Sequence, residues 1–407
     1  MGAVKLEEAA LHRAATEPAR SCCACKNKKQ ERADMAAVGA EEDDSRELIP
    51  GLPDDVAMEC LARVPSRSHR PMRRVCRGWR GAVVSPEFRR RRRLAGAAED
   101  VVFLVQASLP ACGGGGDGKG SSTPQCALAA ANLTTGEWRR VDAEAWGPVP
   151  LFAQCAAAGD GRHVAVVGGW DPRTLRPTSE VRVLDVLAGA WRRGAPVPDH
   201  ARSFFGCAGE GGHVYVAGGH DGDKNALRSA LAYDVAADAW RALPDMAEDR
   251  DEPQLVALRG GRVLAACGYS TEAQGAFKRT AESYDGSGAG AWAHEGDYVV
   301  PAGTCLASVR GNVWAVGAGK GGVREWAGGA GWRDVADGPP GMKACVKAVD
   351  VGDDGSVFVF GTVDDDAAEE EDGRYTAWVM DAAAAWRRVH VPPGFDGFVY
   401  SAAAVRV

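Results

Sequence analysis

The chain has 407 residues, a net charge of −7 at neutral pH, 12 cysteines and 12 tryptophans. The negative balance argues against binding of nucleic acid through the overall charge, and no apolar run of about 18 residues is present that would span a membrane. The first 20 residues lack the apolar core of a secretory signal, so we expect a protein of the cytoplasm or the nucleus with reduced cysteines.

Residues 1–46 are polar, show no hydrophobic periodicity and contain the acidic run EEDD at 41–44. Such a composition buries too little apolar surface to fold, so we expect a disordered tail. Cys22, Cys23 and Cys25 lie close together in this tail, but no second ligand pair is near enough in sequence to favour a zinc site. Met35 is a candidate second start of translation.

Residues 47–93 predict a small helical module. Pro53 is placed for the first turn of a helix, and Asp54 and Asp55 fall where the helix dipole favours acidic side chains. This first helix carries an apolar stripe of Val56, Cys60, Leu61 and Val64. A second helix is predicted to carry Met72, Val75, Cys76, Trp79 and Val83 on one face. Two or three short helices bury little core, so their apolar faces are expected to be covered by a partner protein or by the rest of the chain.

Five consecutive arginines, 89–93, close this module, and residues 94–100 follow as a linker. The arginines fit a nuclear-import signal, a patch for phosphate, or the exposed end of the last helix. We favour the exposed helix end.

A repeated strand pattern follows the linker. The segments VAVVGG, VYVAGG, VLAACG, VWAVGA and VFVFGT start at residues 164, 214, 263, 313 and 357, and are therefore 50, 49, 50 and 44 residues apart. A short apolar run that ends in glycine is typical of a buried strand. Gly218 and Gly219 are expected to turn the backbone with positive φ at a place where a Cβ would clash.

Tryptophan and Asx residues recur with the same period. The six tryptophans are Trp138, Trp191, Trp240, Trp292, Trp332 and Trp386, and the Asx residues before five of them are Asn132, Asp185, Asp234, Asp285 and Asp381. An Asx side chain at the end of a strand favours a turn. The tryptophan is then expected to begin the next strand and to fill the space between units.

Each unit also has an apolar run before its glycine strand, which makes four strands in about 50 residues. Six such units predict an all-β, six-bladed β-propeller over residues 101–407. The first unit lacks an innermost strand, and the segment 397–407 has no blade after it. We therefore expect residues 398–407 to complete blade one and close the ring, with 113–120 and 364–372 as loops.

The helical module resembles an F-box. The segments that carry the resemblance are LPDDVAMECLARVP at 52–65 and MRRVCRGWR at 72–80. The resemblance implies binding to the Skp1-type adaptor of cullin-RING ubiquitin ligases. It assigns this contact to Leu52, Pro53, Val56, Leu61, Val64, Val75, Cys76 and Trp79.

The propeller repeats resemble kelch repeats in their period and in their pairing of glycines with a tryptophan. Residues 47–407 as a whole resemble plant F-box/kelch-repeat proteins. The junction SPEFRRRRRLAG…EDVVFLVQ resembles the subgroup that directs phenylalanine ammonia-lyase to degradation. The resemblance implies a substrate-recognition subunit of a Skp1–cullin–F-box (SCF) ubiquitin ligase, which holds a protein target on the propeller and needs no cofactor or metal.

The target-binding face follows from the topology of a blade. The loop between strands two and three and the loop between blades open on the same face of the propeller. Arginine and exposed tryptophan often anchor interfaces, so we predict that these loops bind the target. The candidates are Trp170, Arg173, Arg202, His220, Asp221, Arg250 and Arg279.

Two other functions fit parts of the pattern. A kelch scaffold, or a regulator of a transcriptional response regulator in hormone signalling, would use the propeller without a ligase. An enzyme would resemble galactose oxidase, a kelch-type propeller that holds copper on Tyr and His. The 8 His of this chain are scattered singly, and we find no nucleophile motif, so we predict a non-catalytic adaptor without nucleic-acid or membrane partners.

Overall fold

The computed structural model describes residues 47–108, 125–141, 146–199, 201–286, 290–295, 299–363 and 374–407. The predicted tail with Cys22, Cys23, Cys25 and Met35 lies outside these residues, as do the predicted loops 113–120 and 364–372. The chain divides into two compact units, residues 1–57 and 58–407. The predicted domain limits at residues 46, 93 and 100 stay predictions.

The helical module contains α2 (Asp54–Ala62), η1 (Ser66–Ser68), α3 (His69–Met72), α4 (Arg77–Val84) and α5 (Pro86–Leu94). The prediction of one helix through Met72 and Trp79 was wrong, because the chain leaves α3 after Met72 and starts α4 at Arg77. Cys76 is extended at this break, and its Sγ accepts a hydrogen bond from the Trp79 amide at 3.4 Å. No described helix is long and apolar enough to cross a membrane.

The described residues form six four-stranded antiparallel sheets, as the sequence predicted. Blades one to three are β24 (Val399–Arg406), β1 (Asp100–Ser108), β2 (Gln125–Asn132), β3 (Trp138–Arg140); β4 (Gln154–Ala157), β5 (His163–Val167), β6 (Val181–Asp185), β7 (Ala190–Gly194); β8 (Gly206–Glu210), β9 (His213–Ala217), β10 (Ala230–Asp234), β11 (Ala239–Leu243). Blades four to six are β12 (Asp251–Leu258), β13 (Arg262–Tyr269), β14 (Ala281–Tyr284), β15 (Ala293–Glu295); β16 (Cys305–Val309), β17 (Asn312–Val316), β18 (Val323–Trp326), β19 (Trp332–Ala336); β20 (Met342–Val351), β21 (Ser356–Val363), β22 (Tyr375–Met380), β23 (Trp386–Val389).

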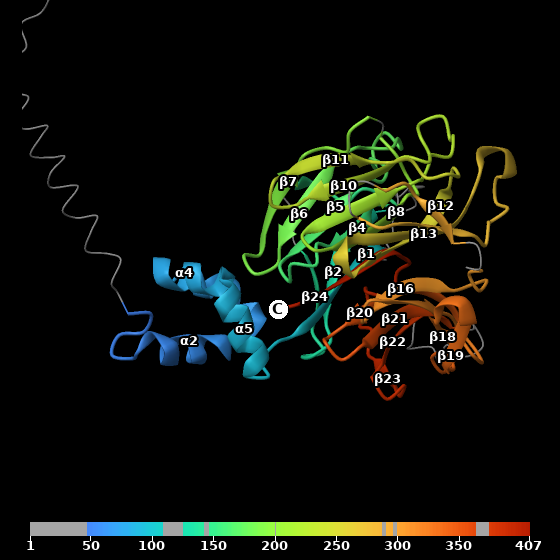
Figure 1. Cartoon of the computed structure of the whole chain (residues 1–407). Helices are drawn as coiled ribbons and strands as arrows, with labels where there is room; N and C mark the ends of the chain where they lie inside the picture. Colours follow the sequence, from blue (N-terminus) through green and yellow to red (C-terminus); the bar gives the residue numbers. More distant parts are fainter. Residues whose placement is uncertain are drawn as a thin grey trace, which may run out of the picture. The chain divides into compact units, whose positions relative to one another are not determined.

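The last strand closes the ring. β24 pairs antiparallel with β1, with Val101 opposite Val405 and Leu104 opposite Ala402, and the two strands lie side by side (Figure 1). Two further bonds between Glu99 and Val407 extend the ladder. The first blade therefore contains both ends of the propeller, and the predicted closure is confirmed.

The Asx residues make the predicted turns. Asp234 Oδ1 accepts bonds from the amides of Ala236 and Ala237, both at 2.9 Å. Asn132 Oδ1 does the same for Thr134 and Thr135 at 3.1 Å. Each turn leads to a tryptophan at the start of the outermost strand, with Trp138 first in β3 and Trp240 second in β11.

Four of the tryptophans tie their blade to the preceding one through the indole N–H. Trp240 donates to the carbonyl of Ala195, Trp292 to Pro244, Trp332 to Val299 and Trp386 to Asp337, at 2.7–2.9 Å. Each acceptor follows the outermost strand of the blade before. The tryptophan thus fills the space between blades, as predicted, and also fixes the register of neighbouring sheets.

Gly218 and Gly219 have φ of +66° and +81°, so both adopt the predicted positive φ. A Cβ on Gly218 would lie 2.3 Å from the Arg250 carbonyl oxygen, and one on Gly219 would lie 2.4 Å from the Ser203 carbonyl oxygen. Two interblade segments therefore run directly against this pair, which explains why only glycine fits.

One glutamate joins the helical module to the first blade. Glu99 accepts bonds from the Ser66 amide at 2.8 Å, the Ser66 hydroxyl at 2.6 Å and the Asn132 amide group at 2.6 Å, and it pairs with Arg92 at 3.2 Å. Arg92 is buried and also donates to the carbonyl of Ala62. The expectation that the whole arginine run 89–93 is exposed was therefore wrong for Arg92.

Candidate functional site

The two kinds of loop expected on the target-binding face do lie together. The backbone of Trp170, in the loop between β5 and β6, pairs with Leu151 in the segment before β4. The backbone of His220, in the loop between β9 and β10, pairs in the same way with Ser203. We call the surface made by these segments and their equivalents in other blades the loop face.

The structure separates the seven predicted target-binding residues by exposure. Arg173 and Arg279 are exposed, Trp170 and Asp221 are half-buried, and His220, Arg202 and Arg250 are buried. Asp221 shapes its own loop, because its Oδ1 accepts bonds from the amides of Asp223 and Asn225 at 2.9 Å.

The prediction that Arg202 and Arg250 are surface anchors was wrong. Arg202 donates to the carbonyls of Gly218 and Ser229 at 3.4 and 3.3 Å. Arg250 donates to the carbonyls of Cys267 and Thr280 at 2.7 and 3.2 Å. Both guanidinium groups therefore turn inward, where they satisfy backbone oxygens at the end of the glycine strand.

His220 lies beneath the loop face between residues of two blades. Its Nε2 is 2.8 Å from Ser203 Oγ, and its Nδ1 is 2.8 Å from Asp251 Oδ2. The three residue types match those of hydrolytic triads, but all three side chains are buried. The arrangement clamps two interblade segments together and offers no open approach to the serine hydroxyl.

An aromatic arc crosses the loop face from blade three to blade one. Phe152 contacts Trp170, Phe204 and Tyr400, with ring centroids 5.5, 4.9 and 5.0 Å apart. Phe398 continues the arc at 4.9 Å from Tyr400. Offset and edge-on aromatic contacts of this kind are favourable beyond their buried area, so the arc is a preformed apolar surface.

Three residues at equivalent positions in the arc and beside it have a strained backbone. Phe152, Phe204 and Glu252 each stand two residues before a paired residue of the innermost strand, and have φ of 58°, 55° and 52°. Side chains other than glycine rarely adopt this conformation, which costs about 1–2 kcal/mol per residue. Strain of this kind persists where the surroundings fix it and is common at binding sites.

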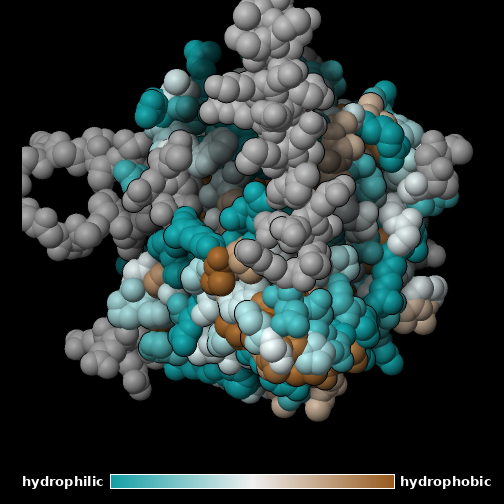
Figure 2. Space-filling view, turned by 90° about the vertical axis from the view of Figure 1, so that its left-hand side faces the viewer, coloured by the Kyte–Doolittle hydropathy of each residue, from teal (hydrophilic) through white to brown (hydrophobic). Residues whose placement is uncertain are grey.

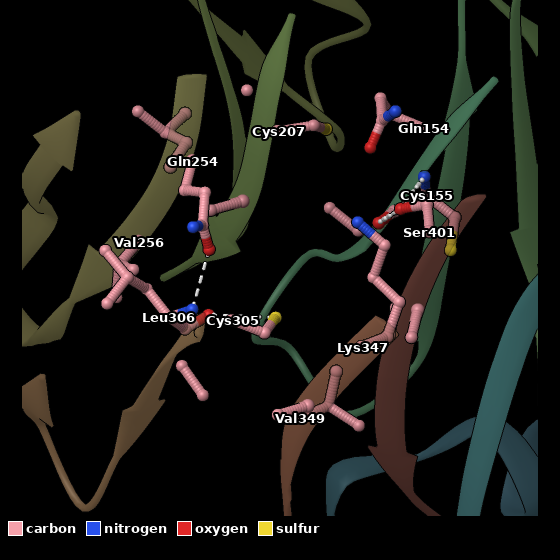
Figure 3. Close-up of a pocket in the computed structure, with 18 of the residues that line it drawn as sticks. Gln154, Cys155, Cys207, Gln254, Val256, Cys305, Leu306, Lys347, Val349 and Ser401 are labelled. Carbon is pink, nitrogen blue, oxygen red and sulfur yellow. Dashed lines mark hydrogen bonds between the residues drawn. The ribbon is translucent and has the colours of Figure 1, made fainter. Parts of the chain in front are cut away.

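These three side chains line one end of a cavity on the propeller axis. The cavity has a volume of about 620 Å³ and is lined by all six innermost strands. Gln154, Cys207, Gln254, Cys305, Lys347 and Ser401, one from each of these strands, surround it (Figure 3). A volume of this size lies within the range of small-ligand pockets.

Most polar groups of the cavity wall are committed to neighbouring strands. Gln254 accepts from the Leu306 amide at 2.7 Å and donates to the Thr304 carbonyl at 2.9 Å. Ser401 Oγ accepts from the Cys155 amide at 2.9 Å. Burial raises the pKa of the Cys155 thiol to about 11, so this thiol is protonated and unreactive at neutral pH. The described residues contain no cluster of His, Cys, Asp and Glu able to hold a metal ion.

Sequence reasoning missed the aromatic arc and the cavity. Phe152 and Phe204 are 52 positions apart and equivalent in the repeat, which was a usable signal. Lys347 could not be predicted as a site residue, because nothing in the sequence of its strand, β20, shows that this side chain faces a cavity.

The helical module presents a second candidate surface. Of the eight residues predicted to bind an adaptor, Val56 and Val75 are exposed by 43% and 62%, and Pro53 and Cys76 are exposed as well. Leu61 is buried and therefore belongs to the core of the module. Figure 2 shows hydrophobic residues gathered in patches on an otherwise largely hydrophilic face.

Comparison with known proteins identifies both modules. The F-box domain model matches residues 49–91 and the Kelch motif model matches residues 201–247, which cover blade three. The chain is 41% identical over 266 residues to the F-box/kelch-repeat protein At2g44130 of Arabidopsis thaliana, covering 61% of this chain and 65% of the relative.

Two further Arabidopsis relatives show similar values. Identity is 42% over 273 residues to F-box/kelch-repeat protein SKIP20, covering 59% of this chain and 64% of the relative. The identity to F-box/kelch-repeat protein At1g80440 is 40% over 243 residues, which cover 59% of this chain and 67% of the relative. The chain thus spans just under two thirds of the length of At2g44130 and SKIP20 and slightly more of At1g80440. The chain belongs to the F-box/kelch-repeat proteins.

Proposed function

We propose that the protein is the substrate-recognition subunit of an SCF ubiquitin ligase, with the F-box bound to a Skp1-type adaptor and the loop face bound to a protein target. The observation that carries the proposal is the combination of exposed apolar side chains on the F-box, Val56 and Val75, with a complete propeller. Exposed apolar patches of this kind mark protein interaction sites.

The proposed role is positional. The protein performs no bond-making step and brings its target close to the ubiquitin-carrying enzyme that the cullin recruits, in the cytoplasm or the nucleus. Rate gains from proximity depend on a fixed geometry. The bonds of Glu99 to Ser66 and Arg92 support such a geometry, because they tie the F-box helices to the first blade.

The target would bind the loop face through the aromatic arc and the exposed Arg173 and Arg279. Aromatic and arginine side chains supply most hot spots at protein interfaces. Within this proposal, phenylalanine ammonia-lyase is the first candidate target, which would make the protein a regulator of phenylpropanoid metabolism. The resemblance of the junction after the F-box is what supports this choice.

The adaptor contact is tested with charge introduced at exposed apolar positions. Val75→Glu should weaken binding to a purified Skp1-type adaptor by at least tenfold, since it places a carboxylate in the buried interface. Leu94→Glu is the matched control, because Leu94 is 75% exposed and outside the predicted contact. Leu61→Asp is unsuitable, because Leu61 belongs to the core.

The outcome separates the proposal from its alternative. Loss of adaptor binding in Val75→Glu alone, with both variants folded, supports an SCF subunit. Wild-type protein that binds no adaptor, yet captures a target through the propeller, would instead indicate the kelch scaffold or regulator. For the target, steady-state phenylalanine ammonia-lyase should fall when the wild type is overexpressed and stay constant with Val75→Glu; an unchanged level with the wild type excludes this enzyme as target.

A further inference from the structure

We propose that the axial cavity of the propeller binds a monocarboxylate that carries an aromatic body, with Lys347 as the partner of the carboxylate. The inference goes beyond the adaptor function and does not depend on it. It rests on the charge, the walls and the size of the cavity.

Lys347 brings a positive charge to the cavity wall. It extends from β20 into the cavity, on the side of Cys155 and Ser401 (Figure 3). Within the described residues it forms no ion pair and no hydrogen bond, although it is half-buried. A partly buried ammonium group without a partner loses solvation that nothing in the chain replaces, so an anionic ligand would gain a strong contact there.

The neutral groups around Lys347 cannot take this role. Gln254 and Ser401 already exchange bonds with the backbone of neighbouring blades. Gln154 turns its amide group toward the Phe152 carbonyl at 3.5 Å. Lys347 is therefore the polar side chain of this part of the wall that is left for a ligand.

The acidic groups at the two ends limit the ligand to one negative charge. Glu252 lies at the loop-face end, where it accepts a bond from the Tyr269 hydroxyl at 3.1 Å, and Asp350 lies on β20 beyond Lys347. Both carboxyl groups line the cavity, so a ligand with two or more charges would be repelled. A carboxylate satisfies one lysine, whereas a phosphate group brings excess charge.

The side chains at the loop-face end of the cavity determine which apolar group the ligand carries. Phe152, Phe204, Phe398 and Tyr400 line the cavity there. Their rings contact one another, and the strained backbone at Phe152 and Phe204 holds the rings in place. A flat aromatic group could stack against this wall while its carboxylate reaches Lys347.

Two sources could supply such a ligand, and the aromatic carboxylate from either one fits the cavity volume of about 620 Å³. One is a free aromatic acid, and the other is the C-terminal carboxylate of a protein that ends in an aromatic residue. The loop-face end of the cavity lies within the proposed target surface, so either occupant would adjoin a docked target.

The test uses the full chain and four probes observed by saturation-transfer NMR. The first pair is phenylacetate and phenylacetamide, and the second is acetyl-Gly-Gly-Phe with a free or an amidated C-terminus. We expect at least one acid to bind, and its amide to bind at least tenfold more weakly. Binding by phenylacetate alone identifies a free acid as the source, and binding by the acidic peptide alone identifies a chain end.

Variants then assign the contact to the cavity. Lys347→Met should weaken the acid at least tenfold and Lys347→Arg should retain most of the affinity, while Lys320→Met, at an exposed lysine outside the cavity, should change nothing. Phe204→Leu should weaken the aromatic acid severalfold. Circular dichroism and the unfolding midpoint of each variant confirm the fold.

Three results would overturn the proposal. They are no binding of either acid to the wild type at millimolar concentration, equal binding of acid and amide, and undiminished binding to folded Lys347→Met. The comparison of acid with amide uses the wild type alone, so the proposal can fail even if a variant does not fold.

Discussion

Blades three and four bury an arginine at the same position in two different ways. Arg202 and Arg250 each stand four residues before a paired residue of the innermost strand, at Gly206 and Gln254, and each donates to two backbone carbonyls of its own blade. Arg250 also pairs with Glu282 at 3.1 Å and Glu248 at 3.0 Å. Arg202 has no ion pair with any described residue.

The difference traces to one residue in the third strand. Glu282 pairs with Ala265, three residues before Gly268, and Leu231 pairs with Val216, three residues before Gly219. Leu231 therefore occupies in blade three the position that Glu282 occupies in blade four. Arg202 has no carboxylate paired with it among the described residues, and burial lowers its pKa to about 10. The group stays charged at neutral pH, so its lost solvation remains a cost to the fold.

The structural role that Arg202 and Arg250 share is therefore the bonding of backbone carbonyls, because only Arg250 also forms an ion pair. Both arginines close the end of a glycine strand against the next interblade segment. The buried glutamate in blade four adds a second charge, which Arg250 balances and which also accepts bonds from the Ala247 and Glu248 amides at 2.6 and 3.2 Å. We expect the two blades to respond very differently when the arginine is removed.

The largest effect is expected for Arg250→Met. This change leaves Glu282 buried without its cation, and breaking a buried pair from one side costs about 3–5 kcal/mol. Urea unfolding should therefore show a large drop in midpoint. The double variant Arg250→Met with Glu282→Leu removes both charges, copies the leucine of blade three, and should recover most of the loss. A double variant as unstable as the single one would show that the carbonyl contacts dominate instead.

A smaller effect is expected for Arg202→Met. The change removes a charge that has no carboxylate to leave behind, and the relief of its desolvation offsets part of the lost bonds to Gly218 and Ser229. We expect a loss of about 1.5 kcal/mol, at the low end of the range for hydrogen bonds made by a charged group. The same urea titration measures it beside Arg250→Met, and equal losses at the two sites would contradict the role assigned to Glu282.

The contrast also shows where sequence reasoning succeeds. The period of about 50 residues, the Asx turns at Asn132 and Asp234 and the closing strand were predictable, because each is a local or repeated pattern. The burial of Arg202 and Arg250 was not, because an arginine in a polar interblade segment looks the same whether it points outward or back to a carbonyl. The aromatic arc depends on contacts between Phe152 and Tyr400, which are far apart in sequence and meet only when the ring closes.

The smallest effect concerns a device that the two blades share without any charge. Trp240 and Trp292 donate their indole N–H to Ala195 and Pro244, both at 2.8 Å. Replacing either by Phe keeps an aromatic ring between the blades and removes one hydrogen bond, so each should cost about 1 kcal/mol. Because the bonds are alike, the two losses should agree within experimental error, even though the two arginine sites differ. A much larger loss in blade four than in blade three would mean that this blade is generally more sensitive, and would weaken the case that Glu282 alone explains the contrast between Arg250 and Arg202.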